Sequence, residues 1–201
     1  MIFLKKKLFF LAVASLFFLG GCGIDGSGNG NLIYIEYNGA LYCPAPEGWE
    51  ACGDGTEISA KAGYGRKSKK RKCSAVSFGD GTFLVYSHAD TETLLCRCDC
   101  DLPTDADANE DSGILLRVGD EDILLDPESA GNLLGCLCPE RLTEQPETVS
   151  DIGLVFAVFP SVGAMKLLGV VRSLSDGGTV LCRDGRSGYL LPDGFSVDKL
   201  R

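Results

Sequence analysis

Short apolar runs separated by glycine-containing turns are the feature that most constrains this fold. Asn38-Gly39 separates residues 32–37 from residues 40–43, and both of its residues accept the positive φ angles of a type I′ hairpin turn. Similar patterns predict three more hairpins, which pair residues 75–78 with 82–87, 114–118 with 123–125, and 179–182 with 189–191. Repeated hairpins predict a mainly β fold, a small sandwich- or barrel-like domain.

One apolar stretch, residues 152–171, has Lys166 as its single charged side chain and admits two interpretations. Its length is that of a membrane-spanning helix. Pro160 and several interior glycines favour instead a buried strand at 154–159, followed by a short helix at 164–174 with one apolar face. We therefore expect the hairpins to be accompanied by one short C-terminal helix.

The N-terminal segment has the organisation of an export signal. Three lysines precede an apolar run at residues 8–19, which is too short to span a bilayer as a helix. The run ends in Leu19-Gly20-Gly21-Cys22, which resembles the lipobox of bacterial lipoproteins, with Gly20 where that family usually has Ala or Ser. The resemblance implies cleavage before Cys22 and acylation of its thiol. The alternatives are a plain secretory signal and an uncleaved N-terminal helix.

The resemblance divides the chain into a signal peptide (1–21), a lipidated cysteine with a glycine-rich tether (22–31) and a single β-rich domain (32–201). The tether has a random-coil reach of roughly 15–18 Å. In Gram-negative relatives, a residue other than Asp after the cysteine, here Gly23, implies transfer to the outer membrane. Cleavage removes three lysines, which leaves 16 basic and 28 acidic residues and lowers the net charge from −9 to −12. So acidic an exported chain is not expected to bind nucleic acid.

Cysteines after position 22 form the second constraint. They are Cys43, Cys52, Cys73, Cys96, Cys98, Cys100, Cys136, Cys138 and Cys182. Export leads to an oxidising compartment, so we expect a disulfide-stapled domain, and an odd number leaves at least one thiol without a partner in the chain.

Two cysteine groups, 96–100 and 136–138, have cysteines at every second position. On strands these thiols would form rows on one face, joined by disulfides to each other or to neighbouring strands. The alternative is a thiol-rich metal-handling or redox envelope protein, in which the five thiols bind a soft ion such as Cu(I) or Zn²⁺.

An acidic segment is the candidate calcium site. Asp105, Asp107, Asn109 and Asp111 alternate in a pattern that resembles the first half of an EF-hand-like calcium loop and offers oxygen ligands to Ca²⁺. Glu110 replaces the turn glycine, and Leu116 replaces the acid at the twelfth position. The alternative is a solvated acidic loop. No other cofactor is expected.

A basic segment interrupts this acidic chain. Its cations are Arg66, Lys67, Lys69, Lys70, Arg71 and Lys72. Three interpretations remain: a solvated loop, a patch that meets anionic lipid, an anionic envelope polymer or an envelope protein, and a contact with the acidic segment.

Catalytic motifs give no support for an enzyme. The single histidine, His88, lies between Ser87 and Asp90, and proximity in sequence does not arrange three such side chains as a triad. The sequence therefore predicts a binding or structural module, anchored by lipid in the bacterial cell envelope.

Overall fold

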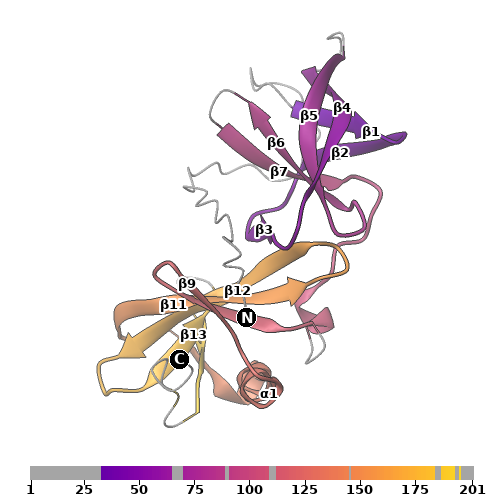
Figure 1. Cartoon of the computed structure of the whole chain (residues 1–201). Coiled ribbons are helices and arrows are strands. Elements are labelled where there is room, and N and C mark those ends of the chain that lie inside the picture. Colours follow the sequence, from indigo (N-terminus) through magenta and orange to yellow (C-terminus); the bar gives the residue numbers. More distant parts are fainter. Residues whose placement is uncertain are drawn as a thin grey trace, which may run out of the picture.

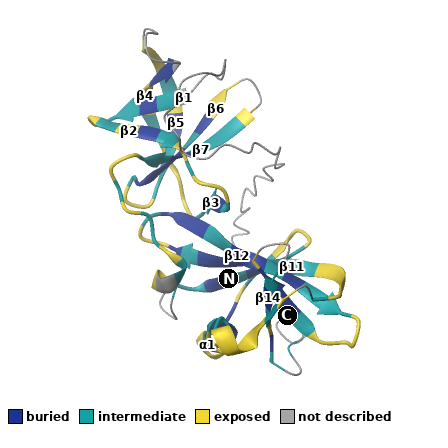
Figure 2. Ribbon diagram, turned by 180° about the vertical axis from the view of Figure 1, so that it is seen from behind, coloured by how far each residue is buried: buried dark blue, intermediate teal, exposed yellow. Residues whose placement is uncertain are grey.

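The computed structural model describes residues 33–64, 70–88, 91–108, 112–144, 146–183, 187–192 and 195. These residues form two antiparallel sheets and one short α-helix, so the expected mainly β fold is confirmed (Figure 1). Buried residues concentrate along the middle of both sheets and where the sheets meet (Figure 2).

The first sheet is a closed six-stranded barrel in the order β1-β2-β7-β6-β5-β4. Its strands are β1 (Ile33–Tyr37), β2 (Ala40–Pro44), β4 (Thr56–Tyr64), β5 (Arg71–Phe78), β6 (Phe83–His88) and β7 (Thr91–Arg97). The interior is filled by side chains, because Ala60 and Ala62 leave room for the larger Ile35, Leu84 and Leu95.

The second sheet follows the order β10-β14-β13-β12-β11-β8-β9, and β3 (Trp49–Ala51) adds to one end of β12. Its other strands are β8 (Ile114–Val118), β9 (Glu121–Leu124), β10 (Leu142–Glu144), β11 (Thr148–Phe159), β12 (Ala164–Leu174), β13 (Thr179–Cys182) and β14 (Ser187–Leu190).

All four predicted hairpins are present, as β1–β2, β5–β6, β8–β9 and β13–β14. In the first, Asn38 and Gly39 have φ angles of 49° and 81°, as a type I′ turn requires. Local turn chemistry was therefore sufficient to locate these pairs.

The helix predicted at 164–174 is wrong, because these residues form β12. The apolar side chains of β12 matched a helical period, but the strand lies between β11 and β13 in the middle of the sheet. A short, largely apolar run of this kind is one that periodicity does not separate from a buried helix. The strand predicted at 154–159 is confirmed within β11, so the membrane-helix interpretation of 152–171 is also wrong. Within the described ranges, no helix is long and apolar enough to cross a membrane.

The short helix lies instead at α1 (Pro127–Gly135). Asp126 is its N-cap, accepting hydrogen bonds from the amides of Glu128 and Ser129 at 3.0 Å each. Pro127 occupies the first helical position, so Asp126 and Pro127 together form a helix start signal that the sequence contains. Leu133 anchors the helix in the core.

The barrel and the second sheet meet at a packed junction. Trp49 of β3 packs against the rings of Phe83 and Phe159, with centroids 5.2 and 5.7 Å away. Beside it, the turn at Gly79 touches the turn at Gly163 so closely that a Cβ atom on either would collide with the other backbone. One hydrophobic cluster therefore runs across both sheets.

Candidate functional site

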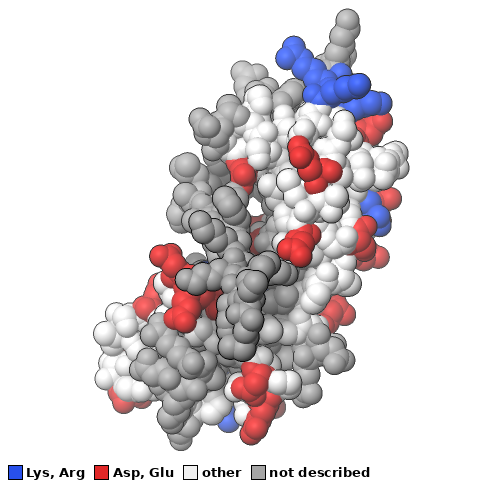
Figure 3. Space-filling view, viewed as in Figure 1, with Lys and Arg blue, Asp and Glu red and all other residues white. Residues whose placement is uncertain are grey.

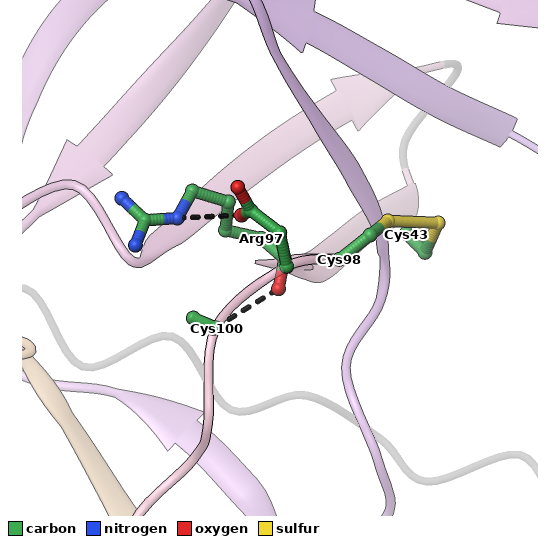
Figure 4. Close-up of a disulfide and its surroundings, with 5 residues drawn as sticks. Cys43, Arg97, Cys98 and Cys100 are labelled. Atoms are coloured by element: carbon green, nitrogen blue, oxygen red, sulfur yellow. Dashed lines mark hydrogen bonds and ion pairs between the residues drawn. A yellow bond between two sulfur atoms is a disulfide. The ribbon is translucent and has the colours of Figure 1, made fainter.

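The first cysteine group lies where β7 leaves the barrel. Cys98 bonds to Cys43 of β2, with a Cα–Cα distance of 6.1 Å, so the expected staple to a neighbouring strand is formed for this pair (Figure 4). The wider disulfide framework is not: among the described residues, Cys52, Cys73, Cys100, Cys136 and Cys138 form no disulfide. The expected strand row is wrong, because β7 ends at Arg97 and a turn follows. In that turn the Cys98 amide donates to Leu41 at 2.8 Å, and the Cys100 thiol donates to the Arg97 carbonyl at 3.0 Å.

The second cysteine group does not lie on a strand either. Cys136 is the buried C-cap of α1, and its amide donates to Leu133 at 3.1 Å. Cys138 precedes the 3₁₀ turn η2 (Pro139–Arg141), and both residues keep free thiols. The predicted strand row at 136–138 is therefore wrong, since the helix cap takes precedence over the period-2 pattern.

Burial keeps several thiols protonated. It raises the pKa of Cys52 to about 11 and raises the pKa of Cys73 and Cys136. It also raises the pKa of Cys100, although the nearby Arg97 acts in the opposite direction. Nucleophilic attack and metal binding both require a thiolate, so these environments oppose both. Among the residues described, no cluster of three or more His, Cys, Asp or Glu side chains is placed to hold a metal ion.

The structure gives the acidic segment other partners than calcium. In the 3₁₀ turn η1 (Asp105–Asp107), Asp105 forms ion pairs with Arg183 and, at 2.7 Å, with Lys166. Asp107 accepts hydrogen bonds at 2.7 Å from the amide and the hydroxyl of Thr104, which lower its pKa. Both carboxylates are therefore engaged in contacts within the chain.

The remaining positions of the calcium pattern are Asn109, Asp111 and the twelfth position, Leu116. Asn109 and Asp111 lie outside the described residues. Leu116, at the twelfth position, is fully buried in the core of the second sheet. It therefore has a packing role.

The basic segment begins β5. Lys70, Arg71 and Lys72 are exposed, whereas Arg66, Lys67 and Lys69 lie outside the described residues. Lys61 of β4 is also exposed and lies directly opposite Lys72. We call Lys61, Lys70, Arg71 and Lys72 the cationic end of the barrel. Figure 3 shows basic side chains gathered there, while acidic side chains are spread over the rest of the visible face.

Glu36 of β1 lies beside the cationic end, opposite Lys61 in the sheet. Lys70 forms an ion pair with Glu36 of β1, and the ammonium group lowers the pKa of that carboxyl group. Lys61 and Lys72 are like charges at directly opposed positions, an arrangement that destabilises an antiparallel pair. Glu36 offsets part of this repulsion, because it lies opposite Lys61 on β1, and an anion that docked here would offset more.

The histidine region does not present a triad-like arrangement in its described part. His88 stacks on Tyr86, with ring centroids 6.1 Å apart. The Ser87 hydroxyl donates to Glu92 at 3.2 Å, and Asp90 lies outside the described residues.

Sequence reasoning missed a charge cluster around Arg117. Its guanidinium donates to Asp122 and to Glu50, both at 2.8 Å, and lies 4.8 Å from the centroid of the Phe156 ring. Glu50 is 67 positions away, so no local spacing signals this contact. The cluster ties β3 to β8 and β9 and is structural.

The fold and these sites define a two-sheet β protein, stapled by a disulfide, with a cationic end on its barrel. Comparisons with protein-family models, with curated proteins and with solved structures found no match to this chain.

Proposed function

We propose that this chain is a lipid-anchored protein of the bacterial cell envelope, in which the residues after the tether form a binding or structural module. The observation that carries the proposal is the sequence Leu19-Gly20-Gly21-Cys22 directly after a short apolar run with a basic start. Acylation of Cys22 would hold the module at the membrane. Its membrane is the outer one in a Gram-negative cell, because Gly23 follows the cysteine.

The Cys43–Cys98 disulfide supports this location, because such bonds persist in oxidising compartments. The environments of the other thiols favour a module over a metal-handling or redox protein. Cys52 and Cys136 are held as neutral thiols by burial, and Cys136 serves as a helix cap.

Intact mass of the natively expressed protein, before and after reduction and alkylation, tests the proposal. We expect a chain that begins at Cys22 and carries acyl groups, in which Cys43 and Cys98 become alkylated only after reduction. Cys22→Ala should abolish acylation and membrane retention, whereas Cys52→Ala, the matched control, should preserve both. A mature chain without acyl groups would overturn the proposal.

A further inference from the structure

The lipid tether joins the barrel at its cationic end. In the register of β1 with β4, Ile33 lies opposite Tyr64, the last residue of β4. The next strand, β5, begins at Arg71, which pairs with Ala62 two residues before that end. The chain therefore enters the barrel beside the hairpin that carries Lys70, Arg71 and Lys72, although 40 or so positions separate them in sequence.

The opposite end of the barrel is occupied by the second sheet. There the amide of Asp80, in the β5–β6 turn, donates to the carbonyl of Ser161, in the β11–β12 turn, at 2.9 Å. The cationic end is thus the end of the barrel that points away from the second sheet (Figures 1 and 3).

Charge is distributed unevenly between these two ends. The cationic end exposes four basic side chains, whereas the second sheet exposes carboxylates such as Glu144 and Asp151. An anionic surface would attract the first and repel the second, so it would orient the molecule as well as bind it.

We propose that the cationic end lies against the anionic phospholipid headgroups of the membrane that holds Cys22, with the second sheet directed away from the bilayer. The inference rests on the proposed lipid anchor. Residues 23–32 span at most ~35 Å when fully extended, so the anchor keeps the cationic end within reach of the headgroups. An acyl anchor and a basic patch on the same side of a protein are the usual combination of two membrane-binding signals.

Lysine labelling on vesicles tests this orientation. The natively expressed chain is added to preformed vesicles of phosphatidylcholine, alone or with phosphatidylglycerol, and an amine reagent labels its exposed lysines for mass spectrometry. We expect Lys61, Lys70 and Lys72 to be protected on the phosphatidylglycerol vesicles only, and the protection to fall at high salt, because salt screens exposed charges.

A pair of single substitutions supplies the matched control. Lys72→Gln should lower the protection of Lys61 about five-fold, the factor that corresponds to about 1 kcal/mol per basic residue near an anionic membrane. Arg141→Gln removes an exposed cation from η2, beside the second sheet, and should change that protection less than two-fold. Far-UV circular dichroism checks that both variants are folded.

Intact mass of the same sample separates the two proposals. Acylated protein with equal labelling on both kinds of vesicle would overturn the orientation and leave the anchor standing. The same labelling is repeated with a soluble anionic polymer in place of the vesicles. If the polymer protected Lys61, Lys70 and Lys72 but phosphatidylglycerol vesicles did not, the orientation would be overturned and a polymer would be identified as the partner. Unacylated mature protein would overturn the anchor on which the inference rests.

Discussion

The contact between Gly79 and Gly163 makes the junction of the two sheets sensitive to a single methyl group. Gly163 has a φ angle of +67°, and a Cβ atom there would collide with the backbone of Phe78 and Gly79. Gly163→Ala therefore combines two costs. The left-handed conformation costs an L-residue about 1–2 kcal/mol. Forcing the turns apart adds the cost of overpacking, about 1–3 kcal/mol.

A second glycine isolates the first of these costs. Gly177 has a similar φ angle of +86°, and a Cβ atom there would meet nothing within 4 Å. Gly177→Ala should therefore lose only about 1–2 kcal/mol of the free energy of unfolding. The difference between the variants, about 1–3 kcal/mol, measures the contact between the two turns.

Urea unfolding followed by far-UV circular dichroism measures both variants. Trp49, the only tryptophan in the chain, lies in the junction with 8% of its surface exposed, so its fluorescence reports on the same contact. We expect Gly163→Ala to shift the native emission spectrum and Gly177→Ala to leave it unchanged. Equal losses of stability in the two variants would refute the reasoning, because the junction would then tolerate the methyl group.

Three further predictions concern the disulfide, an ion-pair cluster and a thiol. Cys43→Ala with Cys98→Ala opens a link across 55 positions and should lower the free energy of unfolding by about 4 kcal/mol in the chain-entropy model, measured in urea without reductant. Arg117→Met should cost about 1–3 kcal/mol, because half-buried Asp122, with 11% of its side chain exposed, loses its hydrogen-bond partner; Arg172→Met, which breaks an exposed pair, should cost less than about 1 kcal/mol. Cys52 should react slowly with iodoacetamide at pH 8 in the native protein and much faster at pH 10, since its raised pKa of about 11 keeps the thiol neutral until the pH approaches that value.

Each of these predictions has an outcome that contradicts it. If a reductant lowered the free energy of unfolding of the double cysteine variant as much as that of the native protein, a disulfide other than Cys43–Cys98 would be responsible for the effect. Equal losses for the two arginine variants would mean that the half-buried cluster around Arg117 is no stronger than a surface pair. Fast alkylation of Cys52 at pH 8 would mean that its thiol is not buried in solution.

The basic and acidic segments show how far local patterns reach. The sequence located six cations in one segment, but not their relation to the tether, which depends on the pairing of Ile33 with Tyr64. It also located Asp105 as a carboxylate in an acidic run, whereas the fold gave it two distant partners, Lys166 of β12 and Arg183 just after β13. The sequence shows which residues are charged, but the fold decides which oppositely charged residues lie next to them.

The amino-acid sequence by itself determined the β class and the four hairpins, because turns such as Asn38-Gly39 depend on the φ angles that neighbouring residues accept. It also contained the signals for α1, in Asp126 and Pro127. Only the tertiary structure decided that residues 164–174 form a strand, that the hairpins divide between a barrel and a second sheet, and that Cys43 bonds to Cys98. The physical reason is that these outcomes depend on contacts between residues far apart in the chain, where pairing with neighbouring strands overrides local periodicity.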